Sequence, residues 1–214
     1  MFLVGLTGGI AAGKSTVAEH WERLGAAHVD ADELARRVVS SGTPAAAEIR
    51  SAFGDHVFDS AGNLDRAAMA AVVFAEPGKR KELEAIVHPA IQAAARAEID
   101  RLSGTLPAAA LVVYSIPLLV ETASQLPFDA VVTVEAPRDK QIERMVKSRG
   151  WTQEDAARRI DAQATPIERA ARADHILSSN QELGLLLRDA EQLYHLLATE
   201  AQRKAATIGL AEGR

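Results

Sequence analysis

The sequence predicts an α/β fold in which a parallel sheet is flanked by helices. Two observations lead to this prediction. Short continuous apolar runs, typical of strands buried on both faces, alternate with longer stretches of helical composition. A glycine-rich segment joins the first of these runs to a helix-like stretch. A chain of 214 residues with 48% hydrophobic residues can bury a full core as a single domain.

The first strand is expected at residues 2–6, and it leads into a complete phosphate-binding motif of glycine, four residues, glycine, lysine and serine. A helix-like stretch follows at residues 16–24. In such a loop the backbone N–H groups and the helix N-terminus hold phosphate, the lysine reaches the terminal phosphates, and the serine helps to hold Mg²⁺. A plain glycine-rich turn is the less favoured alternative, because the lysine, the serine and both flanks are present. The predicted nucleotide-binding residues are Gly8, Gly9, Ile10, Ala11, Ala12, Gly13, Lys14, Ser15 and Thr16.

Ala11 occupies a position where many such loops have glycine. A Cβ atom raises the cost of a positive φ by about 1 kcal/mol. Two alternatives follow from the sequence. Either Ala11 adopts an ordinary backbone conformation, or the loop stores a small amount of strain.

The remaining elements are predicted from hydrophobic periodicity and from glycine and proline positions. Strands are expected at residues 27–29, 111–114, 130–134 and 173–177. Helices are expected at 33–40, 45–53, 66–74, 79–102 with an interruption near Pro89, two between 137 and 163 broken at Gly150, and 181 to about 198. Thr152 and Asp155 are spaced for a capping box, and residues 205–214 are expected to fray.

These elements predict a P-loop NTPase-type domain over residues 1–200, with a core at 1–32, 106–137 and 170–200. Residues 33–105 are too long for a simple crossover, so they are expected to form an inserted helical lobe that binds the acceptor. The charged residues 138–169 are expected to form a mobile helical lid. Residues 201–214 are expected to be a C-terminal tail.

Asp30 and Asp32 end the second predicted strand, where ligands gather in open α/β sheets. One carboxylate can accept the proton of an attacking hydroxyl, and the other can orient metal-bound water. The alternative is an acidic N-cap for the following helix. The chain has no Asn-Lys-x-Asp signature of guanine-specific switches, and its strand at 111–114 does not end in the aspartate of motor ATPases. This pattern favours a small-molecule kinase.

Residues 138–149 contain five basic and two acidic side chains, a local charge of +3 in a chain of net charge −5. Lys140, Arg144 and Lys147 fall on one helical face, which could cover a triphosphate and stabilise charge during phosphoryl transfer. The alternative is a solvated helix in which Glu143 pairs with Lys147.

The composition also predicts several absences. The negative net charge disfavours a nucleic-acid partner. The chain has no run of eighteen apolar residues, so no membrane-spanning segment is expected. The first residues do not resemble a secretory signal, and the absence of cysteine fits a reducing compartment, so a cytoplasmic location is expected. No histidine and carboxylate pattern indicates a zinc site.

The ordered set of motifs resembles the dephospho-coenzyme A kinase family from residue 3 to about residue 197. The motifs are Gly5 to Ile10 leading into Gly13 to Thr16, Asp30-Ala31-Asp32, Gly62-x-Leu64-x-Arg66, Val87-His88-Pro89, Ile116 to Glu121, Gln141-x-x-Arg144, Arg159-Ile160-x-x-Gln163, and Ala173-Asp174-x-Ile176-x-x-x-Asn180. The resemblance implies ATP-dependent phosphorylation of the ribose 3′-hydroxyl of dephospho-CoA, with Mg²⁺, in the last step of coenzyme A synthesis. A monomer or weak homo-oligomer is expected.

The resemblance also implies residue roles. Asp32 would be the base, with Lys14 and Arg144 completing the catalytic set, and Ser15 and Asp30 would contact the metal. Asn180 would join the nucleotide-binding residues. The acceptor side would comprise Asp30, Arg66, His88, Pro89, Pro117, Leu118 and Leu119.

Some features limit this transfer of roles. Many relatives have aspartate at the position of Ser115, so a metal contact there is not expected. The residues alone favour a packed or backbone-bonded His88, and they favour packing roles for Trp21 in the core and Trp151 in the lid. Two rival functions stay open, a kinase for another small acceptor, such as a nucleoside monophosphate or a sugar acid, and a nucleotide-dependent regulator.

Overall fold

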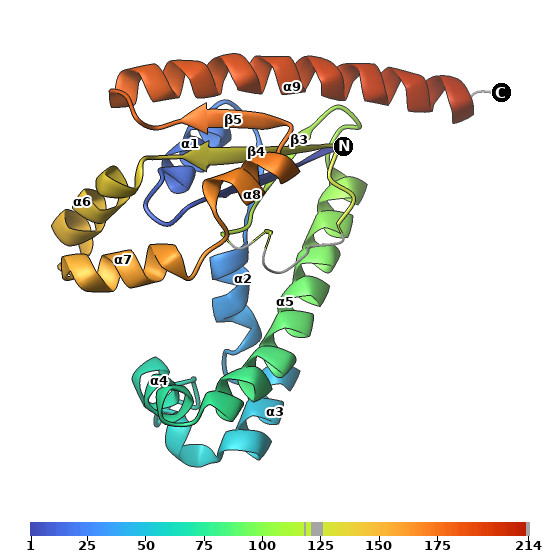
Figure 1. Ribbon diagram of the computed structural model, residues 1–214. Helices are drawn as coiled ribbons and strands as arrows, with labels where there is room; N and C mark the ends of the chain where they lie inside the picture. Colours follow the sequence, from blue (N-terminus) through green and yellow to red (C-terminus); the bar gives the residue numbers. More distant parts are fainter. Residues whose placement is uncertain (118, 121–125, 213–214) are drawn as a thin grey trace. The chain divides into compact units, whose positions relative to one another are not determined.

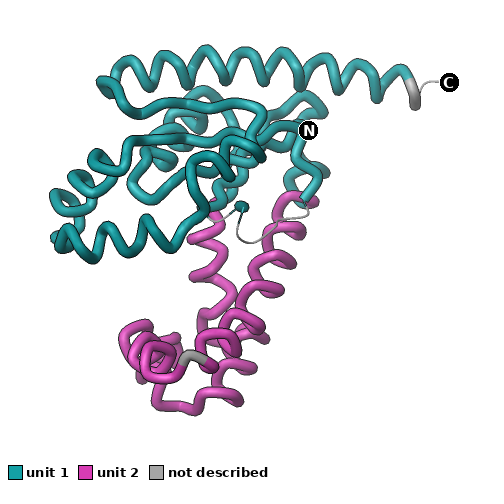
Figure 2. The backbone as a smooth tube through the Cα atoms, viewed as in Figure 1, with its two compact units in different colours: residues 1–29, 101–214 teal, residues 30–100 magenta. Residues whose placement is uncertain are grey.

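The computed structural model describes residues 1–117, 119–120 and 126–212, and it divides the chain into two compact units. Unit 1 consists of residues 1–29 and 101–214, and unit 2 of residues 30–100 (Figure 2). In the described part of the chain, no helix is both long and apolar enough to cross a membrane.

Unit 1 is built on a five-stranded sheet with the order β2-β3-β1-β4-β5. Figure 1 labels β3, β4 and β5 of this sheet. The strands are β1 (Phe2–Gly8), β2 (Ala27–Asp30), β3 (Leu111–Ser115), β4 (Ala130–Glu135) and β5 (His175–Ser178). β1 is parallel to both β3 and β4, and β4 is parallel to β5. Because β1 is central and fully buried, the loop that follows it leaves the middle of the sheet at its carboxyl edge.

Helices α1 (Lys14–Arg23) and α9 (Leu183–Glu212) pack with one face of this sheet into a single hydrophobic core. The alternating residues Phe2, Val4 and Leu6 of β1 point into it. Trp21 lies in the same core and donates its Nε1–H to the Ala190 carbonyl of α9 at 2.7 Å. The packing role expected for Trp21 is confirmed. Unit 1 also contains α6 (Arg138–Arg149), α7 (Gln153–Asp161) and α8 (Pro166–Arg172).

Unit 2 is helical and has a core of its own. Its elements are α2 (Ala31–Val38), α3 (Pro44–Phe53), the 3₁₀ turn η1 (Asp55–Val57), α4 (Arg66–Ala75) and most of α5 (Pro77–Thr105). The buried side chains of this core are Val39, Ile49, Phe53, Val57 and Met69. Side chains cap three of these helices: Asp30 caps α2, Thr43 caps α3, and Asp65 caps α4.

The predicted strands and the break at Gly150 are confirmed, and two helix predictions are wrong. α5 continues through Pro89 instead of breaking there. Proline removes one intrahelical bond, to the carbonyl of Ala85, and the exposure of both residues lets water satisfy that carbonyl. α9 runs to Glu212 rather than ending near residue 198, because Ala201 is buried in the core and Lys204 pairs with Asp129 at 2.6 Å. The residues expected to fray are thus helical to Glu212.

Candidate active site

The phosphate-binding motif forms a tight loop between β1 and the first turn of α1. The Ala12 N–H donates to the Gly9 carbonyl at 3.0 Å, and Gly13, at φ 104°, forms the N-cap position of α1. Lys14 and Ser15 are the first two residues of the helix, and Ser15 is exposed. The first N–H groups of a helix have no intrahelical acceptor, so this end of α1 favours an anion.

Ala11 has a φ of 56°, the only positive φ of a non-glycine residue in the described ranges. The second sequence alternative is therefore the right one, and the loop stores strain at this residue. The stored free energy is about 1–2 kcal/mol, the usual cost of a left-handed conformation for a residue with a Cβ atom.

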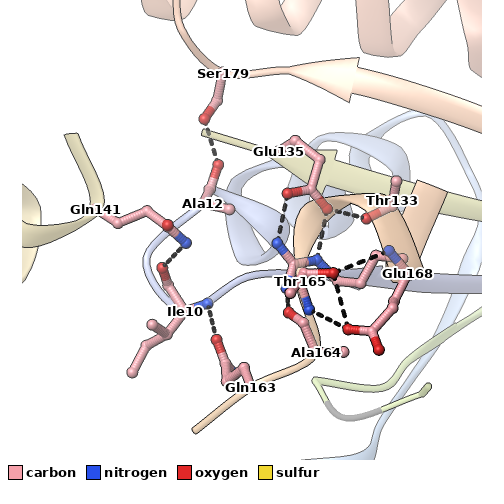
Figure 3. A network of polar contacts seen from close by, with 11 residues as sticks. Ile10, Ala12, Thr133, Glu135, Gln141, Gln163, Ala164, Thr165, Glu168 and Ser179 are labelled. Carbon is pink, nitrogen blue, oxygen red and sulfur yellow. Dashed lines mark hydrogen bonds and ion pairs between the residues drawn. The ribbon is translucent and has the colours of Figure 1, made fainter. Parts of the chain in front are cut away.

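Side chains from distant segments of unit 1 hold the loop backbone (Figure 3). Ile10 is held at both of its backbone polar groups: its N–H donates to Gln163 Oε1 at 2.8 Å, and its carbonyl accepts from Gln141 Nε2 at 2.7 Å. The next carbonyl, of Ala11, accepts from Arg144 Nη1 at 3.0 Å. The carbonyl of Ala12 accepts from the Ser179 hydroxyl at 2.5 Å. Three successive loop carbonyls thus each bind a different side chain, which fixes the peptide orientations of the loop.

Close approaches surround the first two glycines of the motif, to backbone at Gly8 and to a side chain at Gly9. A Cβ atom on Gly8, at φ 155°, would lie 2.4 Å from the carbonyl oxygen of Val134. A Cβ atom on Gly9 would lie 2.4 Å from Gln141 Nε2. These glycines let a neighbouring strand and a holding side chain approach the loop backbone.

Arg169 of α8 forms a buried ion pair with Glu135 at the end of β4. Its Nε and Nη2 atoms lie 2.6 Å from the two carboxylate oxygens, and its Nη1 donates to the Ala164 carbonyl. The hydroxyl of Thr133 also donates to Glu135 Oε1, at 2.7 Å (Figure 3). Only 4% of Arg169 is exposed, and its Nη2 lies 3.1 Å from the place of a Cβ atom on Gly9. The pair therefore connects α8 to the sheet directly beside the loop.

The sequence alone does not single out Arg169 or Glu135, because an arginine on a short polar helix is ordinarily solvated. One local signal could have located the helix that carries Arg169: Thr165 and Glu168 form a capping box, which fixes where α8 begins. Hydrogen bonds from the Thr165 backbone N–H and then its hydroxyl lower the pKa of Glu168.

The basic face predicted on α6 divides into two parts. Lys140 and Lys147 both pair with Glu143, at 3.1 and 3.4 Å, and hydrogen bonds from both lysines lower the pKa of Glu143. The expected Glu143–Lys147 pair of a solvated helix is thus present. Arg144 is placed differently, because its Nη1 also donates to Ser179 Oγ at 2.9 Å and its Nη2 to the Ser179 carbonyl at 2.8 Å. Of the three basic residues, Arg144 is the one bonded to the loop.

Ser115, at the end of β3, contacts His28, a residue that no sequence pattern marks. Its hydroxyl lies 2.8 Å from His28 Nε2, and His28 Nδ1 lies 3.2 Å from Glu22 Oε1. A carboxylate beside Nδ1 favours the proton on that nitrogen, which makes Nε2 the acceptor of the serine hydroxyl. Ser115 is 1% exposed and is therefore a structural link between β3, β2 and α1.

The predicted site residues of unit 2 can be placed within that unit. Asp30 accepts from the backbone N–H groups of Asp32 at 2.7 Å and Glu33 at 3.2 Å, which is the N-cap alternative. Asp32 is exposed on the first turn of α2, and Arg66 is exposed at the start of α4. His88 and Pro89 are exposed on α5, so His88 is not packed, and its backbone-bonded alternative stays a prediction.

The remaining predicted residues belong to unit 1. Pro117 is half-buried and Leu119 is 2% exposed, whereas Leu118 lies outside the described residues. Asn180 is exposed directly after β5, and its N–H donates to Ser178 Oγ at 3.3 Å. Trp151 lies between α6 and α7, with the guanidinium groups of Arg149 and Arg159 at 5.2 and 4.2 Å from its ring centroid. The lid-packing role expected for Trp151 fits these cation–π contacts.

A parallel sheet with a complete phosphate loop between its central strand and α1 defines a P-loop nucleotide-binding protein. Comparison with known proteins narrows this class. The family model for dephospho-CoA kinase matches residues 2–184. The chain belongs to the dephospho-CoA kinase family.

Individual relatives agree with this assignment. The chain is 44% identical over 194 residues to the dephospho-CoA kinase of Leifsonia xyli, covering 91% of this chain and 98% of the relative. It is 48% identical over 179 residues to that of Anaeromyxobacter dehalogenans, covering 84% of each. Among solved structures, a protein of Thermus thermophilus superposes with a TM-score of 0.75 at 32% identity, covering 92% of this chain and 97% of that one.

Proposed function

We propose that this chain transfers the terminal phosphoryl group of ATP to the ribose 3′-hydroxyl of dephospho-CoA, which gives coenzyme A. The observation that carries the proposal is the phosphate loop. Its backbone is fixed by four side chains, and it opens onto a helix that begins with Lys14 and Ser15. Membership of the dephospho-CoA kinase family supplies the acceptor.

ATP is proposed to bind with its phosphates at the loop and at the N-terminus of α1, where Lys14 interacts with the terminal phosphates. Mg²⁺ fits this end of the helix, because the exposed Ser15 hydroxyl is a hard oxygen donor of the kind that the ion prefers. Among the described residues, no group of three or more histidine or acidic side chains could hold a metal ion. This fits a magnesium ion bound mainly through ATP phosphates. Bound there, the ion would neutralise charge that develops on the phosphates.

Asp32 is proposed as the base for the ribose hydroxyl. Asp30 Oδ1 is occupied by two backbone N–H groups at the start of α2, whereas Asp32 is an exposed residue of the same turn. These roles make Asp30 an orienting residue, with its second oxygen as the proposed metal contact, and Asp32 the proton acceptor. Arg144 is proposed to stabilise charge on the transferring group from its position beside Ala11.

The acceptor is proposed to bind to the helical lobe at residues 33–105, with the candidate residues Arg66, His88 and Pro89. A separate compact core in unit 2 supports an independent binding lobe. Pro117 and Leu119 of unit 1 are proposed to belong to the acceptor side, and Asn180 to the nucleotide side. Residues 138–169 are proposed as the lid. A monomer or weak homo-oligomer in the cytoplasm is proposed as the working form.

The proposal is tested by measuring ATP turnover with and without dephospho-CoA. We expect turnover to depend on dephospho-CoA and to fall by about 10²–10⁴-fold in Asp32→Asn, which keeps the shape of the side chain but removes the proton acceptor. Asp30→Asn is the matched control, and its loss should be partly offset by higher Mg²⁺. Slow hydrolysis that ignores dephospho-CoA would indicate a regulator, and activity on another acceptor alone would indicate a different kinase.

A further inference from the structure

Ile10 is the residue of the phosphate loop at which two separate segments meet. Gln141 comes from the first turn of α6, and Gln163 follows the end of α7 at Asp161. These two glutamines bond the carbonyl and the N–H of the same residue, Ile10, at 2.7 and 2.8 Å. They also mark the two ends of the segment 142–162, which we call the helical hairpin.

An ion pair also joins the start of α6 to the end of α7. Arg138, at the start of α6, donates from Nη2 to both carboxylate oxygens of Asp161, at 2.9 and 3.0 Å. Both side chains are more than half exposed, so this pair adds only a modest restraint between the start of α6 and the end of α7. The two glutamines therefore reach Ile10 from two segments that an ion pair joins to each other.

The two glutamines act with opposite polarity. Gln163 accepts a hydrogen bond through its amide oxygen, and Gln141 donates one through its amide nitrogen. Because these bonds fix the N–H of one peptide and the carbonyl of the next, they set the orientation of both peptides that flank Ile10. These peptides directly precede Ala11, which holds the strained φ of 56°.

Gly9 leaves room for Gln141 to approach the loop. This amide approaches so closely that a Cβ atom on Gly9 would lie 2.4 Å from Nε2. The φ of Gly9 is not in the left-handed region, so steric room rather than backbone conformation explains the glycine. Gln141 is also 3% exposed, which excludes most water from its bond to Ile10.

We propose that Gln141 and Gln163 are positioning residues that hold the phosphate loop in its nucleotide-binding conformation and couple it to the helical hairpin. They act on ATP through the Ile10 backbone and do not themselves transfer charge or protons. The inference rests on the proposed function only in that the loop binds ATP. The backbone N–H groups that receive phosphate are then placed before the nucleotide arrives, which lowers the ordering cost of binding.

The test uses the polarity difference. Glutamate in place of Gln163 keeps an acceptor for the Ile10 N–H, whereas glutamate in place of Gln141 removes the donor and sets a carboxylate against the Ile10 carbonyl. Both substitutions add one negative charge next to the same residue, so the charge itself cancels in the comparison. ATP affinity is measured by titration calorimetry, and exchange of the Ile10 amide hydrogen is measured by NMR on the full chain.

We expect Gln163→Ala to speed exchange of the Ile10 amide by about tenfold, because it removes one hydrogen bond, and Gln163→Glu to leave that amide protected. Gln141→Glu should bind ATP roughly 2- to 10-fold more weakly than Gln163→Glu, the usual worth of one hydrogen bond.

Unchanged Ile10 exchange in Gln163→Ala, or equal ATP affinities of the two glutamate variants, would overturn the proposal. Neither readout requires turnover. A wild-type chain that binds ATP but does not phosphorylate dephospho-CoA would refute the proposed function and leave the result for the two glutamines standing.

Discussion

The buried pair of Arg169 and Glu135 should be the most stabilising ion pair among the described residues, and Arg169→Met tests this. Methionine retains much of the apolar stem but removes the cation and its bonds to Glu135 and Ala164. The Glu135 side chain, which is 16% exposed, would then be a nearly buried carboxylate that keeps the Thr133 hydroxyl as a partner. Removal of one partner from a buried pair costs about 3–5 kcal/mol.

We place the expected loss at the lower end, about 3 kcal/mol, because Glu135 keeps one hydrogen bond and some solvent contact. In a chain of this size a loss of 1 kcal/mol lowers the melting temperature by about 2–4 °C, so Tm should fall by about 6–12 °C. Urea unfolding followed by circular dichroism gives the free energy, and a thermal scan gives Tm.

Arg158→Met is the matched control. Arg158 pairs with Asp155 on α7, and its side chain is 75% exposed, so its loss should cost less than about 1 kcal/mol. The double variant Arg169→Met, Glu135→Met should recover part of the loss, because no buried charge stays unpaired. If Arg169→Met is no less stable than Arg158→Met, the buried pair does not anchor α8 and the reasoning is refuted.

Three further predictions follow from the loop and from α8. Lys14→Ala should abolish phosphoryl transfer with an unchanged circular dichroism spectrum, since Lys14 acts on phosphate charge; near-normal turnover in the folded variant would remove the loop from the mechanism. Ala11→Gly should relieve about 1–2 kcal/mol of strain in the folded chain and cost about 0.4–1 kcal/mol through the added freedom of the unfolded chain, so the free energy of unfolding should be unchanged or higher. A clear decrease of that free energy in urea unfolding would contradict this. Because the pKa of Glu168 is lowered on folding, its contribution to stability is present above the unfolded pKa and is lost as pH falls through the folded value; Glu168→Gln should therefore flatten the acid side of the stability profile, and an unchanged profile would exclude this contribution.

Local patterns were enough to predict the strands and the phosphate loop. Apolar runs can be recognised because a strand buried on both faces consists mostly of apolar side chains. The motif from Gly8 to Ser15 can be recognised because phosphate binding constrains spacing and residue type together. The helix limits at Pro89 and beyond residue 198 were missed. In both places the deciding factor is not local: solvent access to the Ala85 carbonyl, and the contact of Lys204 with Asp129.

The sequence by itself therefore determined the class of fold, the nucleotide loop and the family, because these depend on local patterns and on the order of those patterns along the chain. The tertiary structure alone decided what holds that loop. Gln141, Gln163, Arg144 and Ser179 lie more than 130 residues from their partners in the loop, and the Arg169–Glu135 pair spans 34 residues. Polar side chains of this kind look like ordinary solvated residues in a sequence. Only the packing of α6, α8 and the segment after β5 around the end of the sheet shows which of them are buried and bonded to the backbone.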